Sequence, residues 1–427
     1  MNTVEKYRKY VNTSFLKAME PVVVERGRGS SYVEPDGTEY LDAFSGISVV
    51  NCGHGNREVL EAAKAQMEKL VHCCSYVYHN IPMADLAEKL AQITPGRLQK
   101  TFFGNGGAEA VEGALRLAKQ YTGKYEFIAL THSFHGRSLA TLSVTGNASR
   151  KKGGGPYIPG VAFAPAPYHY RSPFAQKDPK MTARLCARYV EEVIGTQTSS
   201  RVAAFIIEPV MGEGGIIVPE PEYFEELLPI LKKHGIALIA DEVQSGFCRT
   251  GRMFASEHYG LEPEIMAVAK GIANGFPLSG FIAVEEVADS FTPGDHLSTF
   301  GGNPVSCAAA LASIAFMERE KLAEQAAVKG ERLMERLRGL NGRGKIEVGE
   351  VRGRGLMIGV EFVKSRETKE PAGEQAGGLR ALARERRVLF GLGGYYGNVI
   401  RIQPPLTVTD NELDRVLKVL QESIDAL

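Results

Sequence analysis

The strongest constraint on the fold is a repeated pattern in which a short apolar segment ends at a polar or glycine-rich corner. Six such segments occupy Lys100–Phe103, Glu126–Leu130, Val202–Ile207, Ile236–Ala240, Ile265–Ala269 and Phe281–Val284. Helix-like stretches lie between them at Ala108–Tyr121, Thr182–Ile194 and Glu222–His234. Short strands that are apolar on both faces must be covered on both faces. The pattern therefore predicts an α/β fold with a mostly parallel sheet between helices.

The pattern changes after residue 303, where two long helices and two more polar strands follow. We expect them at Val305–Arg319, Leu322–Leu340, Gly355–Val363 and Val399–Gln403, before a last helix that Thr409 and Glu412 begin as a capping box. This indicates a second, smaller α+β domain. The expected division is an N-terminal segment 1–47 that joins the small domain, a large domain 48–303 and a small domain 304–427. The glycine- and proline-rich run from Gly153 to Pro173 is expected to be a long surface loop of the large domain.

Composition excludes several classes of protein. The 427 residues carry 50 Lys and Arg against 50 Asp and Glu, and this balance disfavours partners that reward a basic excess, such as nucleic acid or an anionic membrane. The apolar runs are too short to cross a bilayer, and the N-terminus lacks the pattern of a signal peptide, so the cytoplasm is the expected compartment. The 6 cysteines are too sparse for a disulfide scaffold and lack the spacing of a metal site, so we expect no metal.

Gly104–Ala110 forms a glycine-rich corner between a strand and a helix. Small residues there let backbone N–H groups and the helix N-terminus approach a phosphate. No Gly-Lys-Ser/Thr follows, so this is not a nucleotide-binding P-loop. A tight turn without a ligand is the alternative interpretation.

Two charged residues follow buried strands directly. Asp241 ends the segment 236–240, where a carboxylate needs a cationic partner such as a protonated pyridine nitrogen. Lys270 ends the segment 265–269, where desolvation lowers the pKa of an amine and leaves it nucleophilic. A structural ion pair and a surface lysine are the respective alternatives.

Phe134 and Arg137 follow the strand 126–130, where an aromatic ring can stack on a planar ligand and an arginine can bind a carboxylate. Alternatively, Phe134 belongs to the core and Arg137 is a solvated charge. Taken together, a phosphate cradle, a carboxylate for a pyridine nitrogen, a reactive lysine and a stacking ring are what a protein must supply to hold pyridoxal 5'-phosphate.

The order and wording of these motifs resemble the class III, or ω-amino acid, aminotransferases, including those that act on 4-aminobutyrate. The resemblance covers essentially the whole chain, through GNGGAEAVEGALRLAK, FHGRSLATLSVTG, EPVMGEGG, ADEVQSGFCRTG, AKGIANGFPLSG, STFGGNP and VRGRGLMIGVEF. It implies the fold of pyridoxal-phosphate enzymes of fold type I, with residues 48–303 binding the cofactor. It also implies an obligate homodimer with shared active sites.

The resemblance assigns cofactor roles to individual residues. Lys270 would form the Schiff base and shuttle the proton, and Asp241 would pair with the pyridine nitrogen. The remaining cofactor residues are Val243 beneath the ring, Phe134 over it, Gln244 by the phenolic oxygen, His135 beside them, the amides of Gly107 and Ala108 at the phosphate, and Thr299 reaching the phosphate from the neighbouring subunit.

The resemblance also implies how two substrates share one pocket. Arg401 would bind the α-carboxylate of glutamate, and Glu213 would neutralise Arg401 when an ω-amino donor is bound. Arg137 would hold the distal carboxylate, Ile47 matches the 4-aminobutyrate enzymes, and Glu208 completes the expected substrate-binding set. These points favour transfer from 4-aminobutyrate or a similar ω-amino acid to 2-oxoglutarate. A fixed salt bridge is the alternative for Glu213.

Other activities stay open at this stage. Met211 stands where many relatives have glutamine, two residues from Glu213, and leaves the acceptor undecided. The segment Gly393–Asn398 resembles the alanine–glyoxylate type, so alanine with glyoxylate or pyruvate is an alternative pair. A racemase or epimerase that keeps every cofactor residue is the second alternative, ahead of a dialkylglycine-type decarboxylase or a scaffold that binds the cofactor without turnover.

Overall fold

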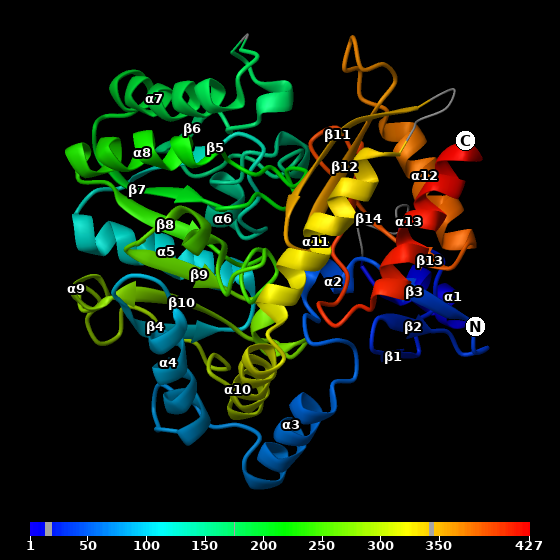
Figure 1. The fold of residues 1–427 in the computed structure, drawn as a ribbon. Helices are drawn as coiled ribbons and strands as arrows, with labels where there is room; N and C mark the ends of the chain where they lie inside the picture. The colour runs from blue at the N-terminus through cyan, green and yellow to red at the C-terminus, as the bar shows by residue number, and fades with distance from the viewer. Residues whose placement is uncertain (13–18, 175, 341–345) are drawn as a thin grey trace.

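Seven strands form the central sheet of the protein in the computed structural model, which describes residues 1–12, 19–174, 176–340 and 346–427 (Figure 1). Their order is β4-β10-β9-β8-β7-β5-β6. The strands are β4 (Leu98–Gly104), β5 (Glu126–Leu130), β6 (Val161–Ala164), β7 (Val202–Ile207), β8 (Ala237–Asp241), β9 (Ile265–Val268) and β10 (Ser279–Val284). Only β10 runs antiparallel to its neighbours, β4 and β9. The predicted mostly parallel sheet is confirmed.

Helices cover both faces of this sheet. Side chains alternate between the two faces along each strand, and apolar side chains on both faces need to be buried. Ala204 and Ile206 of β7 belong to the core cluster that includes α5 (Gly107–Thr122). Phe205 and Ile207, the alternate residues, belong to a second cluster, with α7 (Pro179–Gln197) and α8 (Pro221–His234). Figure 1 shows α7 and α8 side by side along this second face.

The prediction of a continuous surface loop from Gly153 to Pro173 was partly wrong. Residues Val161–Ala164 form β6, which pairs in parallel with β5 and is the edge strand of the sheet. The segment is short and flanked by prolines, which suit an edge strand because proline lacks a backbone N–H. Half-buried and buried residues alternate along β6, whereas the inner strands are buried at every residue. The sequence signal of β6 is therefore weaker than theirs.

A second, antiparallel sheet has the order β11-β12-β15-β14. Its strands are β11 (Glu347–Arg354), β12 (Met357–Val363), β14 (Gly391–Gly393) and β15 (Val399–Ile402). Three helices accompany it: α11 (Leu322–Arg338), α12 (Gly373–Glu385) and α13 (Asp410–Asp425). The predicted capping box of α13 is present, since the Thr409 side chain accepts from the Glu412 N–H and Glu412 accepts in return.

A third small sheet joins the two ends of the chain. Its strands are β1 (Arg26–Arg28), β2 (Ser31–Val33), β3 (Glu39–Asp42) and β13 (Val388–Leu389). Strand β3 pairs in parallel with β13, so the N-terminal segment is hydrogen-bonded to residues near the C-terminus. Backbone pairing of this kind supports the proposal that residues 1–47 join the small domain.

The remaining helices pack around these sheets. They are α1 (Thr3–Tyr10), α2 (Ser45–Ser48), α3 (Arg57–Lys69), α4 (Ile81–Ile93), α6 (Leu139–Ser143), α9 (Glu285–Ala288) and α10 (Pro304–Arg319), with 3-10 turns η1 (Ala148–Arg150), η2 (His169–Arg171), η3 (Ala255–Tyr259) and η4 (Lys270–Ala273). Helix α10 packs against α3, α4 and η4. Within the described ranges, no helix combines the length and the apolarity that a membrane span requires.

Candidate active site

Two adjoining cavities lie where β8 and β9 end and α5 begins. The inner cavity has a volume of about 330 Å³ and the outer about 720 Å³. Three side chains line both cavities: Phe134, Gln244 and Lys270. The carboxyl ends of parallel strands are where open α/β sheets bind their ligands.

Lys270 is the first residue of η4, and Ala269 alone separates it from the end of β9. Its backbone has φ of +46°, an uncommon conformation for a residue with a side chain. Burial lowers the pKa of its amine below 10.5, and the charges of Asp241 and Glu208 oppose that shift. The amine therefore reaches its neutral, nucleophilic form at a lower pH than an exposed lysine does.

Asp241 is the last residue of β8 and is 4% exposed. Its Oδ2 accepts a 2.7 Å hydrogen bond from Nδ1 of the buried His135. Its Oδ1 accepts a 3.1 Å hydrogen bond from the Val243 N–H. A carboxylate has lone pairs for about four donors, so Asp241 is oriented by two donors and can accept a third from the inner cavity.

Helix α5 begins at the wall of the inner cavity, which Gly106, Gly107 and Ala108 line. The Glu109 carboxylate accepts from the N–H groups of Asn105 and Gly106, at 2.6 and 3.0 Å. The next amides have no acceptor inside the helix and suit an anion. A Cβ on Gly107 would lie 2.8 Å from Cγ1 of Val243, so the close approach of helix and strand end needs glycine here.

Glu208 lines the inner cavity, although it was predicted to belong to the substrate-binding residues. Its Oε1 accepts from the Phe134 N–H at 3.0 Å and its Oε2 from the Gly212 N–H at 2.8 Å. Burial raises the pKa of this carboxyl to about 7. Through these two hydrogen bonds, Glu208 links the backbone of Phe134 to the turn that precedes Glu213.

Glu213 and Arg401 face each other in the outer cavity, with 3.1 Å between Oε2 and Nη1. The other Glu213 oxygen, Oε1, accepts a hydrogen bond from Nη2 of Arg150. Burial alone would raise the pKa of Glu213, but Arg401 and Arg150 bring it below its usual value. Sequence reasoning missed Arg150, because a basic residue in a short 3-10 turn carries no recognisable pattern.

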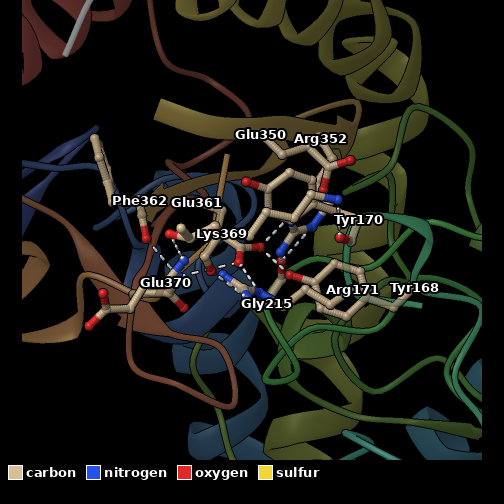
Figure 2. A network of polar contacts seen from close by, with 12 residues as sticks. Tyr168, Tyr170, Arg171, Gly215, Glu350, Arg352, Glu361, Phe362, Lys369 and Glu370 are labelled. Atoms are coloured by element: carbon tan, nitrogen blue, oxygen red, sulfur yellow. Dashed lines mark hydrogen bonds and ion pairs between the residues drawn. The ribbon is translucent and has the colours of Figure 1, made fainter. Parts of the chain in front are cut away.

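The backbone that carries Glu213 is fixed from the β11-β12 sheet (Figure 2). Arg352 Nη2 donates to the Gly215 carbonyl at 2.6 Å, and its Nε donates to the carbonyls of Gly215 and Ile216 at 3.0 Å. Arg352 itself is held by the fully buried Glu361, at 2.7 Å. The Gly394 N–H also donates to the Glu213 carbonyl, at 3.1 Å.

Glu361 is the centre of the network that Figure 2 shows. Besides Arg352 it accepts from Arg171, at 2.6 Å, and from the Tyr168 hydroxyl. These contacts join β12 to the loop that follows β6. Arg352, which binds the turn around Gly215, is therefore held in place by a network of paired charges.

The other expected substrate residues lie around the outer cavity. Ile47 and Arg137 line it, and the Arg137 guanidinium lies 5.4 Å from the centre of the Phe134 ring. Gln244 accepts from Gln403 at 3.1 Å, which orients its amide. Met211 does not line either cavity; its side chain is fully buried in the core beside β7.

Thr299 is the one expected cofactor residue that lies outside both cavities of this chain. It is exposed, and its neighbours Leu297 and Phe300 are 68% and 61% exposed. Phe300 contacts His72, and the segment that follows His72 also carries exposed apolar side chains, at Val77, Tyr78 and Ile81. Exposed apolar side chains thus flank Thr299 in the sequence, and exposed apolar surface is a feature typical of protein–protein interfaces.

The match of the chain to known proteins decides its family. The family model of the class III aminotransferases matches residues 15–424. The chain belongs to the class III aminotransferases. It is therefore a pyridoxal-phosphate-dependent transaminase, as the sequence motifs predicted, and its sheet and helices are those of fold type I.

Relatives of this aminotransferase are named for several different amino donors. It is 40% identical to an acetylornithine aminotransferase of Methanothermobacter thermautotrophicus over 99% of this chain and 98% of the relative. It is 40% identical to a 4-aminobutyrate aminotransferase of Mycobacterium tuberculosis, over 94% and 90%. It is 38% identical to a mitochondrial alanine–glyoxylate aminotransferase 2 homologue of Arabidopsis thaliana, over 99% and 87%. These relatives are all aminotransferases, and their names differ in the amino donor.

The solved structure of an (S)-enantioselective ω-transaminase from Thermomicrobium roseum superposes on this aminotransferase with a TM-score of 0.92. The two are 34% identical, over 100% of this chain and 99% of the other. The inner cavity fits the family's cofactor: it combines a buried carboxylate with spare acceptor capacity, a lysine, an aromatic side chain and a helix N-terminus.

Proposed function

We propose that this aminotransferase moves the amino group of an ω-amino acid such as 4-aminobutyrate to a keto acid, with 2-oxoglutarate favoured. The observation that carries the proposal is the Glu213–Arg401 pair in the cavity next to Lys270. A paired arginine suits a donor that lacks an α-carboxylate, and a released arginine suits glutamate and 2-oxoglutarate. One pocket can then serve both substrates.

The bound cofactor supplies an electron sink for the substrate carbon that loses its proton. Asp241 holds a proton on the pyridine nitrogen, which strengthens that sink, and His135 keeps the carboxylate in place. The Nζ of Lys270 would hold the bound cofactor, and as a free amine it would move the proton at the substrate carbon. Phe134 and Val243 position the ring from the walls of the inner cavity, and the Gly107 and Ala108 amides bind the phosphate.

The outer cavity holds the substrate in this proposal. Arg401 binds the α-carboxylate of glutamate or 2-oxoglutarate, and Arg137 binds the distal carboxylate. Ile47 gives the cavity an apolar side chain where a second amine of the substrate would need a polar partner. Glu208 acts behind Phe134 and Gly212 instead of touching the substrate.

We also propose that the enzyme is a homodimer in which Thr299 of each chain completes the phosphate site of the other. The exposed side chains of Leu297 and Phe300 beside Thr299 support this proposal, because large apolar side chains exposed together are typical of surfaces that a partner covers.

The proposal is tested by recording the visible spectrum of the purified holoenzyme with single substrates. We expect 4-aminobutyrate to bleach the cofactor band and 2-oxoglutarate to restore it. Restoration by glyoxylate or pyruvate after L-alanine would favour the second candidate, the alanine–glyoxylate type, which the exposed Tyr395 and Tyr396 segment at the outer cavity also fits. Perturbation by either alanine enantiomer without consumption of a keto acid would indicate a racemase.

The substitution Glu213→Gln tests the paired arginine. It leaves Arg401 without a counter-charge when an ω-amino donor is bound, so kcat/KM for 4-aminobutyrate should fall about tenfold or more, the scale of one lost charged hydrogen bond. The reaction of glutamate should change much less, because glutamate brings its own carboxylate. Equal losses in the two reactions would contradict the substrate assignment.

A further inference from the structure

Arg150 lines the outer cavity and gives Glu213 a second guanidinium partner, which sequence reasoning did not identify. Its Nη2 donates to Oε1 of Glu213, while Arg401 contacts the other oxygen, Oε2. The three side chains therefore carry two positive charges and one negative charge. One carboxylate shared by two guanidiniums leaves one positive charge available for an incoming anion.

The backbone of Glu213 has little freedom to move. Arg352 holds the carbonyls of Gly215 and Ile216, and the Gly394 N–H holds the carbonyl of Glu213 itself. Any change of partner must therefore come from the side chain of Glu213. That side chain is 13% exposed, so an unpaired carboxylate there would be costly.

We infer that Arg150 is a positioning residue that retains Glu213 when Arg401 is released to bind the α-carboxylate of a substrate. This inference rests on the proposed function of Glu213 and Arg401. In the released state the charges form two pairs, Arg401 with the substrate and Arg150 with Glu213, and no buried carboxylate is left alone. The Nε of Arg150 is buried and has no hydrogen-bond partner among the described residues. It is therefore available as a second donor to Glu213 in the released state.

The substitution Arg150→Gln removes the retaining charge and leaves the Glu213–Arg401 pair in place. The two half-reactions are measured separately on the holoenzyme, from the absorbance of the cofactor. For the 2-oxoglutarate half-reaction we expect an apparent dissociation constant about tenfold higher, since one charged hydrogen bond is lost in the released state. The 4-aminobutyrate half-reaction should stay within about twofold, because Arg401 remains neutralised. This is the reverse of the pattern expected for Glu213→Gln.

Arg150→Lys is the matched control, since it keeps the charge and should restore most of the affinity for 2-oxoglutarate. The double variant Arg150→Gln, Glu213→Gln separates action through Glu213 from direct binding. If Arg150 acts through Glu213, its substitution has no further effect on 2-oxoglutarate once Glu213 is neutral. An undiminished effect in the double variant, or equal losses in both half-reactions of the single variant, would overturn the inference.

The outcomes also distinguish this inference from the proposed function. If Glu213→Gln affects donor and acceptor equally, the proposed function of the Glu213–Arg401 pair fails. If Glu213→Gln behaves as expected and Arg150→Gln is silent in both half-reactions, the role of Arg150 alone fails. The Arg150 side chain is 30% exposed, so the fold should tolerate its replacement, and thermal unfolding of each variant checks this.

Discussion

Lys270 shows how one residue is prepared for chemistry by its position. It lies one residue beyond the end of β9, adopts a left-handed backbone conformation and lines the inner cavity together with Asp241 and Glu208. Burial disfavours its charged form, and the two carboxylates offset part of that cost. The same desolvation that makes the amine nucleophilic must therefore reduce the stability of the folded chain while the amine is protonated.

This cost makes the stability of the cofactor-free protein depend on pH. The folded protein releases the Lys270 proton at a lower pH than the unfolded chain, whose lysine pKa is 10.5. Between the two pKa values the unfolded state binds more protons, so stability rises with pH. Lys270→Met should therefore be more stable than the wild type at neutral pH, and the gap should close by about 1.4 kcal/mol per pH unit within that window.

Urea unfolding of both cofactor-free proteins, measured at several pH values up to 10.5, checks this expectation. Lys64→Met is the matched control, because the Lys64 side chain is 59% exposed and should show no such convergence. A gap in stability that is independent of pH would contradict desolvation of the Lys270 amine as its cause.

At the scale of elements, the start of α5 determines how the cofactor phosphate can be held. The helix approaches Val243 so closely that Gly107 has no room for a Cβ. Gly107→Ala should push the helix terminus or Val243 away and weaken cofactor binding about tenfold, or about 1.4 kcal/mol. Gly106→Ala is the matched control, since a Cβ at Gly106 meets nothing within 4 Å.

Equilibrium binding of the cofactor to the stripped variants gives the two dissociation constants. Similar values for Gly107→Ala and Gly106→Ala would show that the close approach to Val243 is not what shapes the phosphate site.

The elements also show what the sequence could and could not predict. Asp241 and Lys270 were found because a charge after an apolar strand is conspicuous. The buried strands β7 and β9 were found because each is a short, uniformly apolar run that ends at a polar corner. Strand β6 was missed because it is short, lies at an edge and has prolines on either side. Arg150 was missed because its importance comes from meeting Glu213, 63 residues away in the chain, and no local pattern reports such a contact.

At the scale of the whole molecule, the proposed dimer places Lys270 and Thr299 of one active site on different chains. Lys270→Ala should be inactive, and Thr299→Glu should repel the phosphate and lose the cofactor. A hybrid of the two variants has one site with both residues intact. Random mixing of unfolded chains followed by refolding should then recover about a quarter of the wild-type activity, from half of the dimers with one site each.

Activity of the refolded mixture, compared with each variant refolded alone, is the measurement. A mixture no more active than its components would place Thr299 and Lys270 of each site on the same chain and contradict the shared site.

The two cavities meet at Phe134, Gln244 and Lys270, and this shared wall has a consequence for rate laws. In the proposed function, amino donor and keto acid occupy the same outer cavity, so each must leave before the other enters. Double-reciprocal plots of initial rate at several fixed acceptor concentrations should then be parallel. High concentrations of the keto acid should slow turnover, because it occupies the outer cavity of the enzyme form that is waiting for the donor.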